Sequence, residues 1–286
     1  MHRLKEIPSF LRRKLGYAAP LIPYQMLDRE YIVRKGHFRS KPDYDDAWLL
    51  SCARHTEIVF DVGANIGQTA FVILLSDKVK KLVLVEPNPE ALTASAEHLV
   101  RNHLSARVNL VCALAAEAHD QTVQFWTTGI AAASSIYADQ AGTAKKKNSF
   151  IRVPTTSIDY LCDFYGVVPD LVKIDVEGAE CKVLSGSTRC ASYAKTRFLV
   201  ELHPTPVSVA ENAREVIRWS ETVGYRTWYL KEHVALDDSK QVQHRGRCHV
   251  LLQPASWSYP TWLKGIQQSD GLTKALAADV TDSSQS

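Results

Sequence analysis

The sequence of 286 residues predicts an α/β protein with a Rossmann-like, doubly wound, seven-stranded and mostly parallel sheet. Short runs that are apolar throughout alternate with helical patterns from about Ile58 onward. Continuous apolar runs are typical of strands buried on both faces, and their alternation with helices is typical of right-handed βαβ units. Hydrophobic residues make up 45% of the chain and charged residues 23%, which are ordinary values for a globular protein.

The first half of the expected sheet contains three strands separated by helices. The strand Ile58–Val62 is followed by a helix over Gln68–Ser76. The strand Lys81–Glu86 is followed by a helix that ends near Leu104, and Val108–Cys112 is the third strand.

The middle of the chain interrupts this alternation. Thr122–Trp126 alternates polar and apolar residues as an exposed strand does, and a loop rich in Gly, Ala and Ser follows over Gly129–Ser135. Phe150–Val153 is expected to return as a strand. We interpret this segment as an insertion at the edge of the sheet, near the ligand-binding face.

Regular alternation then resumes to the end of the sheet. The expected elements are a helix over Ile158–Tyr165 capped by Ser157, a strand over Leu171–Asp175, a helix over Gly178–Leu184, a strand over Phe198–His203, a helix over Val209–Val223, and a C-terminal antiparallel hairpin of Tyr225–Leu230 and His249–Leu252.

These elements divide the chain into three segments. Residues 1–45 are expected to form a basic helical extension, residues 46–256 the α/β domain, and residues 257–286 a tail that is partly disordered. The extension suits packing on the domain or on a partner subunit, so a homodimer stays open, and peripheral membrane contact is the alternative.

Composition limits the class of partner and the compartment. The net charge of +3 is far below that of a dedicated nucleic-acid binder, so nucleic acid is disfavoured. The six cysteines form no CxxC pair and no zinc-type spacing, which indicates free thiols in a reducing cytoplasm. No apolar run reaches the length of a transmembrane helix, and none resembles a signal peptide.

Acidic residues end four of the expected core strands. These are Asp61, Glu86, Asp175 and Glu201, and His203 lies two residues beyond the last. Open parallel sheets bind ligands at the carboxyl ends of their strands. The sequence therefore predicts a polar site at this edge.

The turn after the first strand favours S-adenosylmethionine over a dinucleotide. Gly63 and Gly67 have the spacing G-x-x-x-G, which does not meet the dinucleotide fingerprint G-x-G-x-x-G. Asp61 before the turn is expected to hold an ammonium group, and Glu86 to bind ribose hydroxyls. A ligand with amino, carboxylate and ribose groups but no phosphate is S-adenosylmethionine.

Four sequence blocks resemble the FkbM-type methyltransferases, a family of Rossmann-like, class I S-adenosylmethionine-dependent enzymes. They are DVGANIG at 61–67, VEPNP at 85–89, SID at 157–159 and KIDVEGAE at 173–180. The resemblance extends over about Glu57 to Leu252. It implies O-methylation of a hydroxyl on a saccharide or natural-product small molecule.

The resemblance also implies a cofactor site. Ala113 follows the third strand, where an adenine contact is expected, but no acid follows it directly. The expected cofactor-binding residues are Asp61, Gly63, Asn65, Gly67, Glu86, Asn88, Ala113 and Asp175.

The expected catalytic residues lie on the fourth and fifth strands. Asp175 and Glu177 are placed near the donor methyl group, although Glu177 is also suited to capping the next helix. His203 is the expected general base because an unperturbed histidine has a pKa of about 6.5. Glu180 is expected on the helix surface or in a local pair.

Acceptor and metal contacts are also expected near these strand ends. Ser134 and Ser135 in the insertion, together with Glu201, are the candidate substrate contacts. Asp175, Glu201 and His203 are a candidate ligand set for Mg²⁺, which would orient the acceptor and lower the pKa of its hydroxyl.

Two other functions stay open at this level. The chain could methylate nitrogen in a small molecule or in RNA, although it lacks an Asn-Pro-Pro-aromatic motif after the fourth strand. It could also be a non-catalytic partner that retains the fold.

Overall fold

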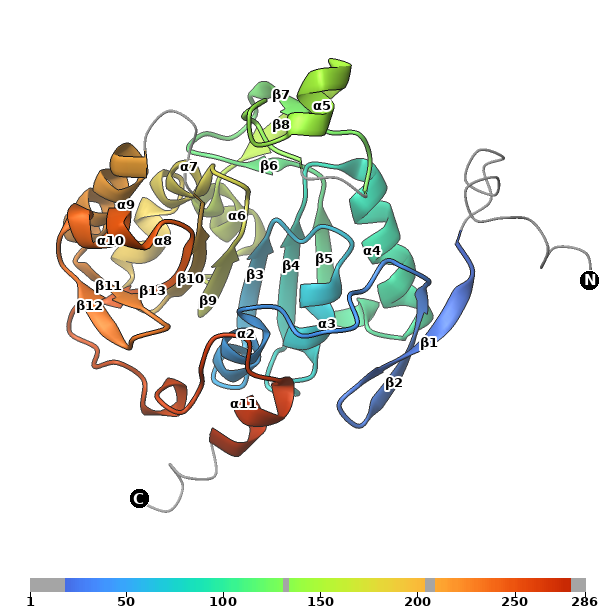
Figure 1. Cartoon of the computed structure of the whole chain (residues 1–286), viewed down its shortest axis with the longest axis horizontal. Helices are drawn as coiled ribbons and strands as arrows, with labels where there is room; N and C mark the ends of the chain where they lie inside the picture. The colour runs from blue at the N-terminus through green and yellow to red at the C-terminus, as the bar shows by residue number, and fades with distance from the viewer. Residues whose placement is uncertain (1–18, 131–133, 204–208, 279–286) are drawn as a thin grey trace, which may run out of the picture.

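The computed structural model describes residues 19–130, 134–203 and 209–278, and within them the main sheet has eight strands (Figure 1). The strands are, in sheet order, β12 (Val234–Leu236), β11 (Tyr225–Tyr229), β13 (Cys248–Pro254), β10 (Arg197–Leu202), β9 (Leu171–Ile174), β3 (Ile58–Val62), β4 (Lys81–Val85) and β5 (Val108–Val111). Strands β10, β9, β3, β4 and β5 are parallel neighbours, whereas β13 is antiparallel to β10 and β11. The predicted doubly wound sheet is confirmed. Its eighth strand, β12, is only three residues long, too short to show a hydrophobic period.

Helices cover both faces of this sheet. They are α2 (Asp46–Ala53), α3 (Gln68–Leu74), α4 (Pro89–Arg101), α6 (Ile158–Tyr165), α7 (Glu180–Ser185), α8 (Thr188–Ser192), α9 (Val209–Val223), α10 (Ser239–Arg245) and α11 (Leu272–Ala278). The short 3₁₀ helices η2 (Ser105–Arg107) and η3 (Thr261–Leu263) complete the set. The predicted cap of α6 is present, because the Ser157 side chain accepts a hydrogen bond from the Tyr160 N–H.

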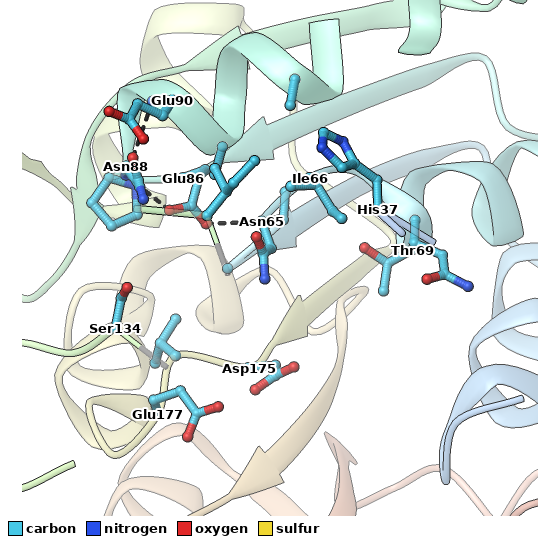
Figure 2. Close-up of a pocket in the computed structure, with 18 of the residues that line it drawn as sticks. His37, Asn65, Ile66, Thr69, Glu86, Asn88, Glu90, Ser134, Asp175 and Glu177 are labelled. Atoms are coloured by element: carbon cyan, nitrogen blue, oxygen red, sulfur yellow. Dashed lines mark hydrogen bonds between the residues drawn. The ribbon is translucent and has the colours of Figure 1, made fainter. Parts of the chain in front are cut away.

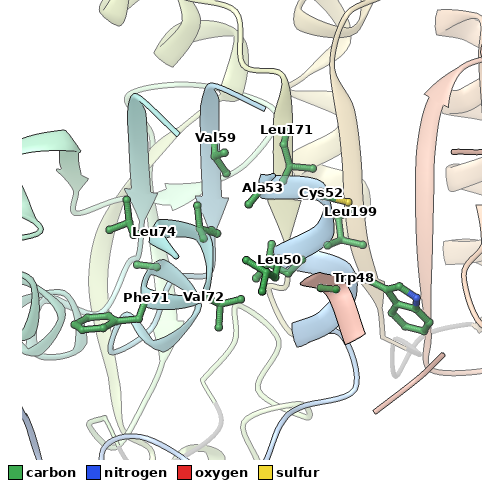
Figure 3. Close-up of a cluster of buried hydrophobic side chains, with 14 of the residues drawn as sticks. Trp48, Leu50, Cys52, Ala53, Val59, Phe71, Val72, Leu74, Leu171 and Leu199 are labelled. Atoms are coloured by element: carbon green, nitrogen blue, oxygen red, sulfur yellow. The ribbon is translucent and has the colours of Figure 1, made fainter. Parts of the chain in front are cut away.

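Successive residues of each core strand point to opposite hydrophobic layers. In β3, Val59 packs with residues of α2, α3 and α11, whereas Phe60 packs with residues of α6 to α9. Figure 3 shows the first layer, in which Trp48 and Leu50 of α2 lie against the strands. Burial on both faces explains why the core strands are apolar throughout.

The N-terminal extension is not helical where the structure describes it, so that prediction is wrong there. Strands β1 (Leu21–Met26) and β2 (Arg29–Arg34) form an antiparallel hairpin beside α4 (Figure 1). Tyr31 and Val33 are buried in the core, and Arg34 forms a salt bridge of 2.6 Å with Glu97 of α4. Residues 1–18 lie outside the described part.

The segment after residue 256 belongs to the domain up to Ala278, which corrects the predicted boundary. Trp262, Leu263 and Ile266 are buried in the first hydrophobic layer, and α11 packs against α2. The segment contains no continuous apolar run of strand length, so the sequence pattern did not reveal its packing. Residues 279–286 lie outside the described part.

The mid-chain insertion forms a sheet of its own. Strands β6 (Leu114–Ala115), β8 (Phe150–Thr156) and β7 (Thr122–Trp126) lie in that order, and the helix α5 (Gly142–Lys147) precedes β8. Figure 1 shows this unit at the end of the main sheet opposite to α11. The returning strand is confirmed, but the insertion is not an edge of the main sheet. No helix in the described ranges has the length and apolar character needed to cross a membrane.

Candidate active site

A cavity of about 1250 Å³ lies at the carboxyl ends of β3, β4, β9 and β10. Side chains from these strand ends face one another across it, with Asp175 and Glu177 opposite Glu86 and Asn88 (Figure 2). This is the edge at which open parallel sheets bind ligands. The cavity therefore lies at the edge of the sheet where the sequence predicts a polar site.

The turn after β3 requires glycine at Gly63. Its φ of 82° is left-handed, and a Cβ atom there would lie 1.8 Å from the backbone oxygen of Asp175. The turn therefore lets the ends of β3 and β9 approach closely. The next residues, Asn65 and Ile66, line the cavity.

Glu86 is held in place by the backbone of two turns. Its Oε2 accepts a hydrogen bond of 2.9 Å from the Asn65 N–H, and its Oε1 accepts one of 2.8 Å from the Asn88 N–H. Burial raises the pKa of Glu86 to about 7, although both hydrogen bonds lower it. Each oxygen retains acceptor capacity, so the carboxylate is suited to bind a pair of hydroxyls.

Asn88 lines the cavity and also has a structural role. It caps α4, because its side-chain oxygen accepts a hydrogen bond of 3.0 Å from the Glu90 N–H. Its side-chain nitrogen donates to Thr127 of the insertion at 3.3 Å. The residue thus joins the cavity wall to both elements.

Asp61 and Gly67 support the cavity without lining it. Asp61 is fully buried and accepts a hydrogen bond of 2.6 Å from Thr69. Gly67 begins α3, and a Cβ atom there would lie 2.3 Å from the hydroxyl of Ser95. The position of Asp61 therefore does not support direct contact with a ligand. Glycine is needed at residue 67 because this turn packs closely against Ser95 of α4.

Lys173 lies between two carboxylates. Its ammonium nitrogen is 3.2 Å from Asp175 Oδ2 and 3.8 Å from Asp61 Oδ1. Burial alone would lower the pKa of Lys173, but the charges of Asp175 and Asp61 raise it, so the ammonium stays charged. Lys173 is therefore the shared ion-pair partner of the two carboxylates.

Asp175 and Glu177 line the cavity, and the buried His203 lies beside them; we call these three residues the floor of the cavity. One ligand atom from each lies within 4.8 Å of the other two, and His203 Nε2 is 3.5 Å from Glu177 Oε2 and 4.0 Å from Asp175 Oδ1. Glu177 has a left-handed backbone with φ of 51°, and Ser135 donates a hydrogen bond of 2.8 Å to its carbonyl oxygen. Few non-glycine residues adopt this conformation, and the Ser135 hydrogen bond helps to hold Glu177 in it.

Glu180 orients His203, so its predicted surface position is wrong. The Glu180 side chain is fully buried, and its Oε1 accepts a hydrogen bond of 2.8 Å from His203 Nδ1. Burial alone would lower the pKa of His203, but the Glu180 hydrogen bond and the surrounding carboxylates raise it to about 9. The imidazole is therefore protonated at neutral pH, which argues against the expected role of His203 as a free base.

Glu201 contacts Arg247 and His249 and is not part of the candidate metal-ligating group. Its Oε1 accepts a hydrogen bond of 2.5 Å from Arg247 Nε, and its Oε2 lies 3.7 Å from His249 Nε2. The candidate metal-ligating group that the structure brings together contains Glu177 in place of Glu201. The sequence did not indicate Arg247 or His249, because it gave no register for β13 against β10.

Two of the remaining predicted contact residues do not line the cavity. Ser134 lines the cavity, but Ser135 is buried and supports the Glu177 turn instead. Ala113 is buried and does not line the cavity, whereas its neighbours Leu114 and Ala115 line it.

The N-terminal hairpin supplies a further wall that the sequence did not predict. Arg34, His37 and Arg39 line the cavity on the side of α3 and α4. The Arg39 N–H donates a hydrogen bond of 2.9 Å to the Gln68 side chain. No local motif marks these residues, because their position depends on long-range packing.

Comparison with known proteins places the chain in a family. The methyltransferase FkbM domain matches residues 61–227, which include the Gly63 turn, Glu86, the floor of the cavity and Glu201. The chain belongs to the FkbM-type family of S-adenosylmethionine-dependent methyltransferases. No match was found among curated proteins.

Solved structures give more distant similarities. A methyltransferase FkbM from Methylobacillus flagellatus KT is 16% identical with a TM-score of 0.44; the match covers 69% of this chain and 43% of that one. A precorrin-6y C5,15-methyltransferase from Geobacter metallireducens GS-15 is 14% identical with a TM-score of 0.42 and coverage of 81% and 95%. An rRNA-methylase described as putative, from Clostridium thermocellum, is 10% identical with a TM-score of 0.45 and coverage of 75% and 97%.

Proposed function

We propose that this methyltransferase transfers a methyl group from S-adenosylmethionine to a hydroxyl of a small molecule such as a saccharide or natural product. The observation that carries the proposal is the acidic floor formed by Asp175, Glu177 and His203 beside the Glu86 wall. A positively charged donor is favoured next to carboxylates, and a hydroxyl needs a group that accepts its proton.

The residues that line the cavity fit the donor. The anchored carboxylate of Glu86 suits the two ribose hydroxyls, and Leu114 and Ala115 offer an apolar surface for the adenine. The close turn at Gly63 leaves the backbone exposed to the ligand, and Asp175 supplies negative charge for the ammonium. When bound, S-adenosylmethionine supplies a methyl group that its sulfonium charge makes electrophilic.

The acceptor would enter between the insertion and β10. Ser134 and Ile130 of the insertion line one side of the cavity, and Glu201 and Arg247 line the other. The chain's main task is alignment of the two reactants. In our proposal the acceptor oxygen gains the methyl group, and its proton passes to the Asp175 carboxylate, because His203 already carries a proton at neutral pH.

The protein is proposed to act in a reducing cytoplasm. The six cysteines of the chain all lie in the described ranges and are free thiols there. This agrees with the compartment expected from their spacing.

Two measurements test the proposal. Calorimetry should show binding of S-adenosylmethionine by the native chain and strongly reduced binding by Glu86→Ala. Incubation of labelled donor with a metabolite extract should then transfer label to an oxygen atom, with much slower transfer by Asp175→Asn. Label on nitrogen would favour an N-methyltransferase, and absence of donor binding would favour a non-catalytic partner.

A further inference from the structure

The strongest unexplained feature of the cavity floor is the ring nitrogen Nε2 of His203. The side chain is only 4% exposed, and Nε2 has no hydrogen-bond partner among the described residues. A buried polar atom without a partner is costly, so it commonly marks the place of a ligand. This atom points toward the carboxylates of Asp175 and Glu177, which line the cavity.

The surroundings of His203 resemble the outer layer of a metal centre. A metal-ligating histidine usually donates its other N–H to a carboxylate, which fixes the ring and makes it a better ligand. Glu180 provides this contact, since its Oε1 lies 2.8 Å from Nδ1. The arrangement therefore presents Nε2 toward two carboxylates in a fixed orientation.

The separations between the three donor atoms suit a single cation. Asp175, Glu177 and His203 each offer one atom, and these atoms lie within 4.8 Å of one another. Glu201 Oε1 is 3.9 Å from His203 Nε2, but it is held by Arg247 at 2.5 Å, which leaves it less free to ligate.

We infer that Asp175, Glu177 and His203 bind a divalent cation at the acceptor end of the cavity, with Glu180 as the positioning residue. One nitrogen and two carboxylate oxygens suit a cation such as Mn²⁺ or Mg²⁺ that completes its coordination with water or a substrate oxygen. This inference rests on the proposed function for its role, which is to bind the acceptor hydroxyl and lower its pKa. Binding of the cation displaces the Nε2 proton of His203 to solvent, so that Nε2 and the Asp175 carboxylate both act as ligands. The proton of the acceptor hydroxyl then leaves to water instead of passing to Asp175.

A titration of the full, metal-stripped chain with Mn²⁺ tests the site directly. Electron paramagnetic resonance of the free ion should show one saturable site per chain. Glu177→Gln and His203→Gln should raise the Kd at least about tenfold, and Glu180→Gln should raise it about 10- to 100-fold. The exposed Glu221→Gln should leave the Kd unchanged, and Glu201→Gln should change it less than about threefold.

The outcomes separate this inference from the proposed function. Absence of saturable binding, or equal binding by all variants, would overturn the cation site. Full methyl transfer after exhaustive chelation, with no Mn²⁺ binding, would also overturn it and leave the methyltransferase proposal intact. Mn²⁺ binding with the expected variant pattern but without S-adenosylmethionine binding would support the site and reject the donor proposal. Circular dichroism of Glu177→Gln, whose side chain is 37% exposed, checks that the fold is retained.

Discussion

Oε1 of Glu180 lies 2.8 Å from Nδ1 of His203, and both side chains are almost completely buried. This contact joins the start of α7 to the end of β10. It fixes the imidazole and contributes to a raised His203 pKa of about 9. The pair therefore connects α7 to β10 and helps to keep a positive charge on His203.

The raised pKa of His203 predicts a specific dependence of stability on pH. Because the folded-state pKa of about 9 exceeds the unfolded value of about 6.5, the contribution is fully present below pH 6.5 and is lost as pH rises through 9. We expect the difference in unfolding free energy between the native chain and His203→Gln to fall by about 3 kcal/mol between pH 6 and pH 10. Urea unfolding at several pH values measures this difference, and a constant difference would contradict it.

Removal of the Lys173 charge should destabilise the fold strongly. Lys173→Met leaves Asp61 and Asp175 without their shared cation, and breaking a buried pair in this way costs about 3 to 5 kcal/mol. Lys182→Met is the control, because its salt bridge with Glu117 is exposed and such pairs contribute at most about 1 kcal/mol. Equal losses in chemical denaturation would show that the buried network is not stabilising.

Substitution of Gly63 by alanine should destabilise the protein more than the same substitution at a left-handed glycine that has open space around it. Gly224 is the matched control, with φ of 72° and no atom within 4 Å of an added Cβ. Gly224→Ala should cost about 1 to 2 kcal/mol from the backbone conformation alone. Gly63→Ala adds a collision with the Asp175 carbonyl, so it should lose more stability and weaken S-adenosylmethionine binding. Calorimetry and urea unfolding of both variants test this, and similar losses would contradict it.

The sequence predicted the parts of the molecule that local pattern determines. The strand Ile58–Val62 and the helix Val209–Val223 have the expected bounds, since apolar runs and helical periodicity are properties of short windows. The positions of Glu86, Asp175 and Glu177 followed from the rule that ligands bind at the carboxyl ends of parallel strands.

Other parts depend on contacts that the sequence does not encode locally. Glu180 was expected on the helix surface or in a local pair, but the position of β10 places it against His203. Arg247 reaches Glu201 only through the antiparallel pairing of β13 with β10. The hairpin of β1 and β2 was predicted as part of a helical extension, although Tyr31 and Val33 of β2 alternate with more exposed neighbours as in a strand.

Binding of S-adenosylmethionine should strengthen as pH rises through 7. Burial raises the pKa of Glu86 to about 7 in the free protein, and the ionised carboxylate is the better acceptor for ribose hydroxyls. If only the ionised form binds, the affinity should be about tenfold higher at pH 8 than at pH 6. Glu86→Gln should bind more weakly and with less dependence on pH, whereas the exposed control Glu57→Gln should behave like the native chain. Calorimetry across this range measures each Kd, and a native affinity that does not change with pH would show that the Glu86 carboxylate does not hold the donor.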